Sequence, residues 1–72
     1  MKKTFILEDL DCANCAAKME AAIAKLDGVN AVSVNFIMQK LTLEADDAVF
    51  EDVLAQSVKT VKKIEPDCRI RL

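Results

Sequence analysis

The sequence contains no histidine, tyrosine or tryptophan, and it has a single glycine and a single proline. It also lacks a glycine-rich phosphate loop, and no nucleophile stands with a base in a pattern typical of catalysis. We therefore expect a binding module and not an enzyme. The apolar runs are short and interrupted by charges, far below the ~20 residues of a membrane-spanning helix, so direct membrane insertion is not expected.

Neither sign of charge dominates the chain. The formal net charge is −2, and acidic and basic residues are interspersed. Without a basic face, we expect no nucleic-acid partner. The residues after Met1-Lys2-Lys3 follow a strand pattern with no small-residue cleavage site, which argues against a signal peptide. Three cysteines are an odd number and too few for a secreted disulfide scaffold. These observations favour a reducing, cytoplasmic compartment.

The residues that are present describe a short globular chain. Residues 1–72 suffice for one domain, and 53% hydrophobic with 31% charged residues is typical of a folded protein. A domain of this size buries about 60–65% of its unfolded surface. It can form a thin core between two layers, but not a deep enclosed site.

The first half of the sequence predicts a strand, a helix and a strand. Residues 3–8 alternate between apolar and polar faces. Asn14 suits the N-cap of a helix, and Asp27-Gly28 suits its end. Residues 31–36 alternate again. The apolar stripe of the helix comprises Cys15, Met19, Ala22, Ile23 and Leu26.

The second half predicts a strand, a helix and a strand. Residues 40–44 alternate, close enough to the preceding strand to form a hairpin with it. Asp46 or Asp47 suits the N-cap of the second helix, and Pro66 cannot continue that helix. The stripe of this helix comprises Phe50, Val53, Leu54, Ser57, Val58 and Val61. The inward positions of the last strand are Cys68, Ile70 and Leu72.

This order of elements predicts a ferredoxin-like βαββαβ sandwich, an α+β fold. Each strand has one apolar face and each helix one apolar stripe, so a four-stranded antiparallel sheet with both helices on one face buries them all. Right-handed crossovers place the strands in the order 4-1-3-2. The loop after the first strand and the loop around residues 64–66 should then lie side by side.

The loop after the first strand carries the motif Asp11-Cys12-Ala13-Asn14-Cys15. Two thiols at this spacing can hold a soft or borderline metal ion, or form a redox dithiol. Cys15 falls in the first turn of the expected helix, where the helix dipole favours a thiolate. The adjacent Asp11 favours a metal site, because it adds an anionic oxygen beside the thiols.

The whole chain resembles the heavy-metal-associated domain family. The resemblance rests on the CxxC loop after the first strand, on Asp27-Gly28-Val29 after the first helix, and on Val32-Ser33-Val34-Asn35-Phe36 in the second strand. It implies a soluble metallochaperone or the cytoplasmic N-terminal module of a heavy-metal P-type ATPase, and this sequence is most similar to the zinc/cadmium/lead ATPase modules. Copper-handling members typically carry Gly-Met-Thr where this chain has Asp9-Leu10-Asp11. Leu10 would then replace the Met as a hydrophobic plug.

Cys12, Cys15 and Asp11 are therefore the predicted metal ligands. A carboxylate suits Zn²⁺ and is tolerated by Cd²⁺ and Pb²⁺, whereas Cu(I) prefers thiolates. A divalent ion also leaves less excess negative charge beside two thiolates and a carboxylate, and buried excess charge is costly. Asp11 has an alternative interpretation as a solvated loop acid.

Three ligands leave Zn²⁺ one position short of its tetrahedral shell. Water, Glu65, Glu8, Asp9 or a partner's residue could fill that position. Lys62 and Lys63 are interpreted as groups that stabilise the helix C-terminus, with charge compensation of the thiolates as the alternative. The sulfur-containing residues Cys68, Met19 and Met38 are interpreted as core or surface residues and not as ligands.

The sequence thus predicts a module that binds and transfers Zn²⁺, Cd²⁺ or Pb²⁺, with the membrane domain of a metal-transporting ATPase as its partner. The alternatives are a free-standing metallochaperone, including a Cu(I) carrier, and a dithiol redox protein. An exposed, under-coordinated site also allows a metal-bridged dimer. The physiological metal, the affinity and the extent of the complete protein stay open at this point.

Overall fold

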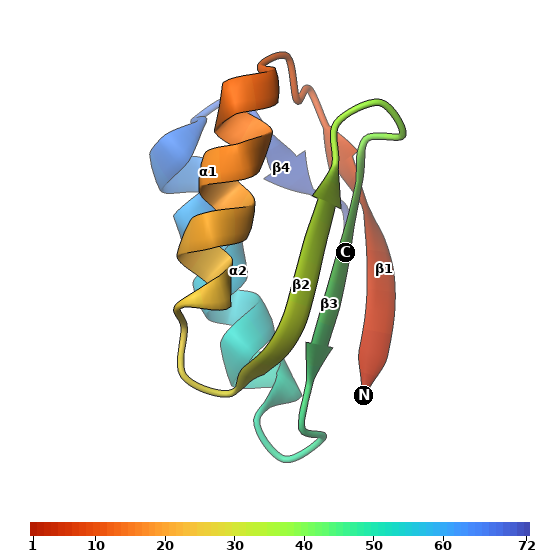
Figure 1. Cartoon of the computed structure of the whole chain (residues 1–72), viewed down its shortest axis with the longest axis vertical. Coiled ribbons are helices and arrows are strands. Elements are labelled where there is room, and N and C mark those ends of the chain that lie inside the picture. The colour runs from red at the N-terminus through yellow and green to blue at the C-terminus, as the bar shows by residue number, and fades with distance from the viewer.

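A computed structural model describes residues 1–72 and shows a four-stranded antiparallel sheet covered on one face by two helices (Figure 1). The predicted fold class is confirmed. The elements are β1 (Lys2–Glu8), α1 (Ala13–Ala24), β2 (Val29–Asn35), β3 (Lys40–Ala45), α2 (Phe50–Ile64) and β4 (Arg69–Ile70). The strand order β2-β3-β1-β4 is the predicted order, read from the other edge. Neither helix has the length and apolar character needed to cross a bilayer.

The antiparallel pairing brings three connections to one end of the sheet. β1 pairs with β3 from Lys2↔Glu44 to Ile6↔Lys40, and it pairs with β4 at Leu7↔Ile70 and Glu8↔Arg69. The β1–α1 loop, the tip of the β2–β3 hairpin and the α2–β4 loop therefore lie together at the upper end of the molecule in Figure 1. This end is called the loop end below.

The core lies between the sheet and the helices. The alternation in the strands turns Leu7, Leu41 and Leu43 inward, and each is at most 2% exposed. Burial of one such side chain contributes about 1.5–3 kcal/mol. The one buried polar side chain, Ser57, is satisfied because its hydroxyl donates to the Val53 carbonyl at 2.8 Å. The full core comprises Leu7, Leu10, Ala16, Met19, Ile23, Leu41, Leu43, Ala45, Phe50, Val53, Val61, Cys68 and Ile70.

The boundaries of α1 differ from the prediction at both ends. The helix begins at Ala13, with Cys12 and not Asn14 as its N-cap. It ends at Ala24, before Asp27-Gly28, because the Lys25 and Leu26 amides bond in tight turns to the Ala22 and Ile23 carbonyls. Gly28 has a φ of +93° and turns the chain into β2. A glycine is needed there because its conformation disfavours any side chain.

The predicted aspartate cap of α2 is wrong. Val49 occupies the N-cap position, and no side chain caps the helix. Asp46 instead accepts a hydrogen bond from the Asn30 side chain at 3.3 Å, and Asp47 forms a 2.9 Å ion pair with the amine of Met1. Acidic residues in the first turn (Glu51 and Asp52) and basic residues in the last (Lys62 and Lys63) complement the helix dipole.

The last strand is shorter than its alternation predicts. Cys68 and Ile70 are buried as expected, but Leu72 is 80% exposed. Paired residues of β4 and β1 end at Leu7↔Ile70, and beyond them the Arg71 amide donates to the Ile6 carbonyl at 2.8 Å. Leu72 has no paired neighbour that would turn its side chain toward the core.

Candidate metal site

The loop between β1 and α1 is anchored by a leucine. Asp9 adopts a left-handed conformation with φ of 61°, which bends the chain out of β1. Leu10 then turns into the core and is 2% exposed, so it is the hydrophobic plug that the sequence predicts. Its backbone amide and carbonyl are also bonded by the side chain of Gln39, from the β2–β3 turn. Asp11 and Cys12 follow at the surface.

Cys12 caps helix α1 with its sulfur. Its backbone is extended, with φ −129° and ψ 119°, and its Sγ accepts a hydrogen bond from the Cys15 amide at 3.2 Å. Its carbonyl accepts from the Ala16 amide at 3.1 Å. An N-cap satisfies amides that the helix itself leaves unbonded, a role that usually falls to Ser, Thr, Asp or Asn. The spacing of the motif therefore builds a helix start and brings the two thiols together.

The two thiols have opposite pKa shifts. Hydrogen bonds from Cys15, through its thiol and its amide, lower the pKa of Cys12. The hydrogen bond between the same two thiols, followed by burial, raises the pKa of Cys15 to about 11. The raised pKa of Cys15 is opposite in direction to the effect that its place in the first turn of the helix predicts. The Cys12 sulfur accepts a hydrogen bond from the amide of Cys15 at the helix start, whereas the Cys15 thiol is a hydrogen-bond donor.

Glu65 from the α2–β4 loop lies beside the thiols. The Cys15 thiol donates to Glu65 Oε2 at 3.6 Å. Glu65 directly follows α2, where its amide donates to the Val61 carbonyl at 2.9 Å and its carbonyl accepts from the Cys68 amide at 3.0 Å. These bonds fix the backbone of Glu65 next to the motif. The prediction that the two loops lie side by side is confirmed.

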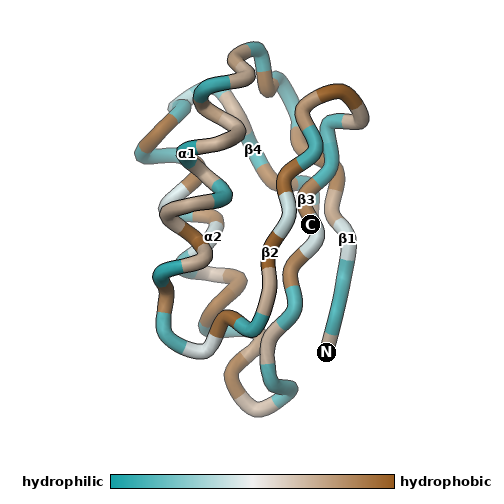
Figure 2. Tube along the Cα trace, viewed as in Figure 1, coloured by the Kyte–Doolittle hydropathy of each residue, from teal (hydrophilic) through white to brown (hydrophobic).

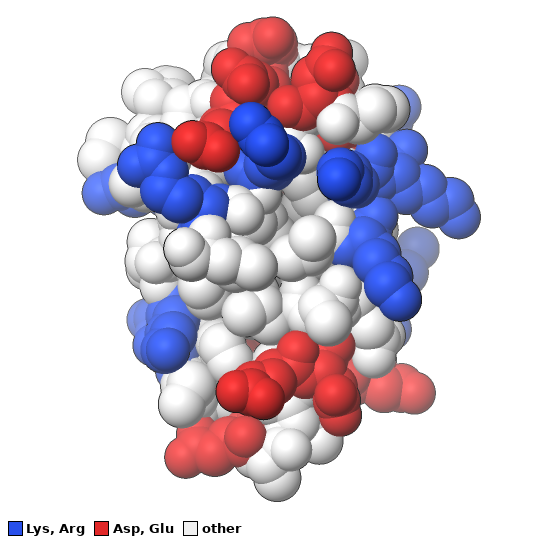
Figure 3. All heavy atoms as spheres, turned by 180° about the vertical axis from the view of Figure 1, so that it is seen from behind, with Lys and Arg blue, Asp and Glu red and all other residues white.

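Asp11 is exposed and lies apart from this cluster. No group of three or more Cys, His, Asp or Glu side chains is arranged to hold a metal ion. Asp11 instead borders an open polar hollow of about 550 Å³. Figure 3 shows acidic side chains crowding the loop end, with basic side chains beside them. The residues that line the hollow are Asp9, Asp11, Lys62, Pro66, Asp67 and Arg69.

Glu8 and Cys68 are engaged elsewhere. Glu8 forms a 2.9 Å ion pair with Arg71 and a 4.0 Å contact with Arg69. Cys68 is fully buried in the core, and this burial raises the pKa of its thiol. Lys62 lines the polar hollow. The donors that a surface ion could reach are therefore the thiols of Cys12 and Cys15 and nearby carboxylates, a set whose chemistry fits soft and borderline metal ions.

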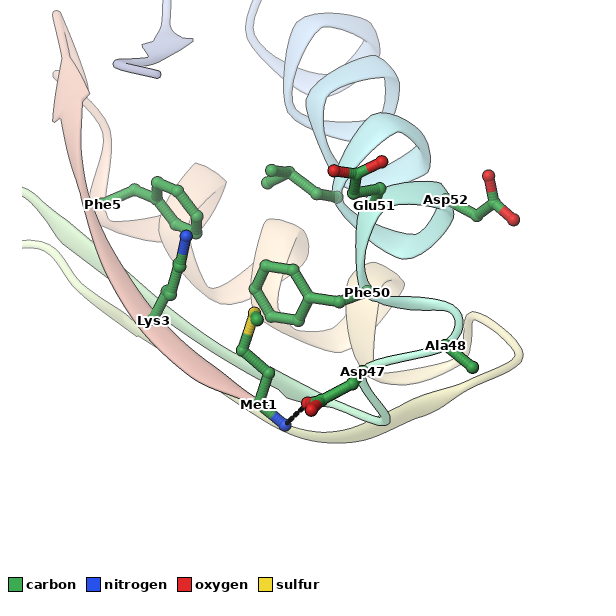
Figure 4. A pocket seen from close by; sticks show the side chains of 9 residues that line it. Met1, Lys3, Phe5, Asp47, Ala48, Phe50, Glu51 and Asp52 are labelled. Carbon is green, nitrogen blue, oxygen red and sulfur yellow. Dashed lines mark ion pairs between the residues drawn. The ribbon is translucent and has the colours of Figure 1, made fainter.

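A second hollow lies at the opposite end of the molecule, between β1 and the start of α2. It measures about 320 Å³, and its apolar lining includes Phe5, Phe50 and Leu54 (Figure 4). The Met1 amine and Asp47 form the ion pair drawn in Figure 4 at its border. No cysteine lines this hollow, so it offers no soft metal ligand beyond Met1.

Comparison with known proteins identifies the family of the chain. The family model of the heavy-metal-associated domain matches residues 4–67. The cadmium, zinc and cobalt-transporting ATPase of Bacillus subtilis (strain 168) is 37% identical over 71 residues, which cover 99% of this chain and 10% of that protein. The copper chaperone CopZ of Enterococcus hirae is 31% identical over 48 residues, covering 67% of this chain and 70% of that one.

A solved structure also resembles this chain over nearly its whole length. The N-terminal domain of ZntA in its apo form superposes with a TM-score of 0.74 at 34% identity, over 99% of this chain and 92% of that domain. The chain thus spans about a tenth of the transporting ATPase it matches, but nearly all of an isolated N-terminal domain. The matched model covers both the thiol loop and the loop of Glu65. The chain belongs to the heavy-metal-associated domain family and is homologous to the metal-binding domains of zinc/cadmium/lead-transporting P-type ATPases.

Proposed function

We propose that this chain binds a divalent soft or borderline metal ion, Zn²⁺, Cd²⁺ or Pb²⁺, and passes it to a partner protein. The observation that carries this proposal is the pair of half-buried thiols of Cys12 and Cys15 at one end of the molecule, held at the helix start where Cys12 Sγ accepts from the Cys15 amide. The pair is accessible, unlike the buried Cys68. Accessible thiols at a surface suit an ion that must enter and leave.

Capture begins at Cys12. The pKa of this thiol is lowered, so its sulfur is the readier of the two to meet a metal ion as a thiolate. Cys15 must lose its proton before it binds the same ion, and the Glu65 carboxylate, 3.6 Å from its sulfur, is placed to receive that proton. Zinc–sulfur bonds of about 2.3 Å then draw the two sulfurs to one ion.

Asp11 supplies the selecting carboxylate in this proposal. Its side chain is exposed and forms no hydrogen bond or ion pair that would have to break, so it is free to rotate toward an ion bound at Cys12. Glu65 is the second carboxylate within reach of the thiols. Two thiolates with one carboxylate leave one tetrahedral position open. An incoming thiolate from a partner can occupy it before the first ligands leave, which permits transfer by stepwise exchange.

The setting that we propose is the cytoplasmic metal-binding module of a heavy-metal efflux ATPase, with the membrane domain of that ATPase as acceptor. It is supported by 37% identity to the ATPase of Bacillus subtilis over nearly the whole chain. A free-standing metallochaperone is the second candidate, because the match to CopZ covers most of that small protein. The nucleotide sequence downstream of the codon for Leu72 distinguishes the two: a linker with transmembrane helices supports the module, and a stop codon supports the chaperone.

Competitive titration of reduced protein with Zn²⁺, Cd²⁺, Pb²⁺ and Cu(I) tests the metal assignment. We expect one divalent ion per chain, and loss of the preference for divalent ions in Asp11→Ala. Asp27→Ala removes an exposed loop carboxylate far from the thiols and serves as the matched control. If Asp11→Ala retains the native preference, Asp11 is only a loop acid and a copper carrier becomes the better assignment. Catalysed reduction of a test disulfide would instead favour a dithiol redox protein.

A further inference from the structure

The side chain of Gln39, at the end of the β2–β3 hairpin turn, makes three hydrogen bonds. Its Oε1 accepts from the Leu10 amide at 3.1 Å, and its Nε2 donates to the Leu10 carbonyl at 2.6 Å. The same Nε2 donates to the Phe36 carbonyl at 2.9 Å. Every acceptor of Nε2 is a carbonyl and the donor to Oε1 is an amide, so the orientation of the Gln39 side chain is fixed by its partners.

The Gln39 side chain extends the hydrogen bonding between β1 and the hairpin beyond the point where the backbone bonds end. The Gln39 carbonyl accepts from the Leu7 amide at 2.7 Å, which is the last backbone bond between β1 and the hairpin. Beyond it, Asp9 turns away from the sheet in a left-handed conformation. The amide of the Gln39 side chain then presents a donor and an acceptor to Leu10, as a neighbouring strand would.

The backbone at Gln39 is itself in a conformation that its residue type disfavours. Its φ is 55°, in the left-handed region that glycine and asparagine adopt more readily than glutamine. Asn35 stabilises the same turn, because its Oδ1 accepts from the Met38 amide at 2.9 Å. A long amide side chain in a position better suited to glycine indicates a role for the side chain beyond the turn.

We propose that Gln39 is a positioning residue for the metal loop. It fixes both backbone groups of Leu10, and Leu10 is followed directly by Asp11 and Cys12. The hairpin thereby holds the incoming half of the loop, while the N-cap bond to Cys12 holds the outgoing half. The effect on metal affinity rests on the function proposed above. The ordering of Leu10 does not, and it can be measured without metal.

The neighbouring residues at the tip of the hairpin expose apolar side chains. Ile37 is 89% exposed and Met38 57% exposed. They form the brown tip of the β2–β3 hairpin in Figure 2, at the loop end. Neither side chain is bonded to Leu10, so Met38→Ala changes the same turn without removing the hydrogen bonds of Gln39.

The test compares two substitutions at Gln39. Gln39→Gly relieves the left-handed strain and removes the amide. Gln39→Asn keeps an amide and a residue tolerated in this conformation, but its side chain is one methylene too short for Leu10. Hydrogen exchange of the metal-free protein should show the Leu10 amide exchanging about tenfold faster in both. The amide of Leu43, in the centre of the sheet, serves as the internal reference for global stability.

Zn²⁺ titration provides the second readout. We expect both variants to bind Zn²⁺ about tenfold more weakly, the lower end of the effect of removing a group that orients ligands. Gln56→Asn, the same chemical change on the exposed surface of α2, and Met38→Ala should leave Leu10 exchange and Zn²⁺ affinity unchanged.

Two results would overturn the proposal. One is a Leu10 amide that exchanges no faster, relative to Leu43, than in Gln56→Asn. The other is faster exchange with native Zn²⁺ affinity, which would mean that the order at Leu10 does not reach the ligands. If the native protein itself binds no Zn²⁺, the proposed function fails, and the role of Gln39 in ordering the loop is decided by Leu10 exchange alone.

Discussion

At the scale of single residues, the two thiols of the motif are chemically distinct although the sequence presents them as a pair. Cys12 accepts hydrogen bonds and has a lowered pKa, whereas Cys15 donates and has a pKa of about 11. The thiolate is the form that reacts with electrophiles and with metal ions. In the metal-free protein, the thiolate form is thus favoured at Cys12 and disfavoured at Cys15.

We predict that iodoacetamide alkylates Cys12 of the metal-free protein at lower pH than Cys15. A lowered pKa keeps a thiolate at pH values below the ordinary thiol range, while a pKa of about 11 leaves Cys15 protonated through neutral and mildly basic pH. Mass spectrometry after limited labelling at a series of pH values measures each site. Cys68, fully buried, is the internal control and should stay unlabelled. Earlier labelling of Cys15 than of Cys12 would refute the assignment.

A second prediction concerns Glu65. Its carboxylate raises the pKa of Cys15, both as hydrogen-bond acceptor and as negative charge. Glu65→Gln keeps the shape and removes the charge, so the pKa of Cys15 should fall and its labelling should begin at lower pH. Glu44→Gln, a carboxyl in β3 at the far end of the sheet, is the control. An unchanged Cys15 profile would mean that Glu65 does not act on the thiol in solution.

At the scale of elements, substitutions at the start of α1 can separate the capping role of Cys12 from its proposed role as a metal ligand. Ser is a strong N-cap residue and Ala a poor one. Cys12→Ser should therefore keep most of the thermal stability of the metal-free protein, and Cys12→Ala should lower Tm by about 4–8 °C relative to it. Both should lose metal affinity, because each removes a sulfur ligand. Thermal unfolding followed by circular dichroism in a chelator measures the difference, and equal Tm values would contradict a capping role for Cys12.

The elements also show how far the sequence determines the structure. The order β2-β3-β1-β4 follows from apolar alternation in the strands and one stripe per helix, both of which are local patterns. The start of α2 differs from the prediction because it depends on distant partners. Asp46 is bonded to Asn30 and Asp47 to Met1, so neither is available as a cap.

The same limit applies to the candidate site. The topology predicted that the thiol loop and the loop of Glu65 would meet, because both are connections at one end of the sheet. The bonds of Gln39 to Leu10 join residues 29 positions apart through a side chain in an irregular turn. No periodicity marks such a contact. Whether Asp11 joins the thiols on a bound ion depends on rotation of an exposed side chain, which a pattern of residues does not determine.

At the scale of the whole molecule, the core and the thiols lie in different places. Thirteen buried side chains fill the space between sheet and helices, and among the thiols only Cys68 is one of them. Small zinc domains that fold only with metal use the ion in place of such a core. This protein has its own core, so metal binding adds to a fold that already exists, and the delivery proposed above does not require unfolding.

The last prediction follows from this separation. A chelator should leave the native protein folded, with unchanged far-ultraviolet circular dichroism, because the core does not depend on metal. Added Zn²⁺ should raise Tm progressively, since an ion that binds only the folded state stabilises it by about 2.7 kcal/mol at a hundredfold excess over Kd. Cys15→Ser should be folded and show a thermal unfolding transition, but added Zn²⁺ should not raise its Tm. If the chelator itself unfolds the native chain, the ion is a structural element, and a site that holds it so firmly would be unsuited to delivery.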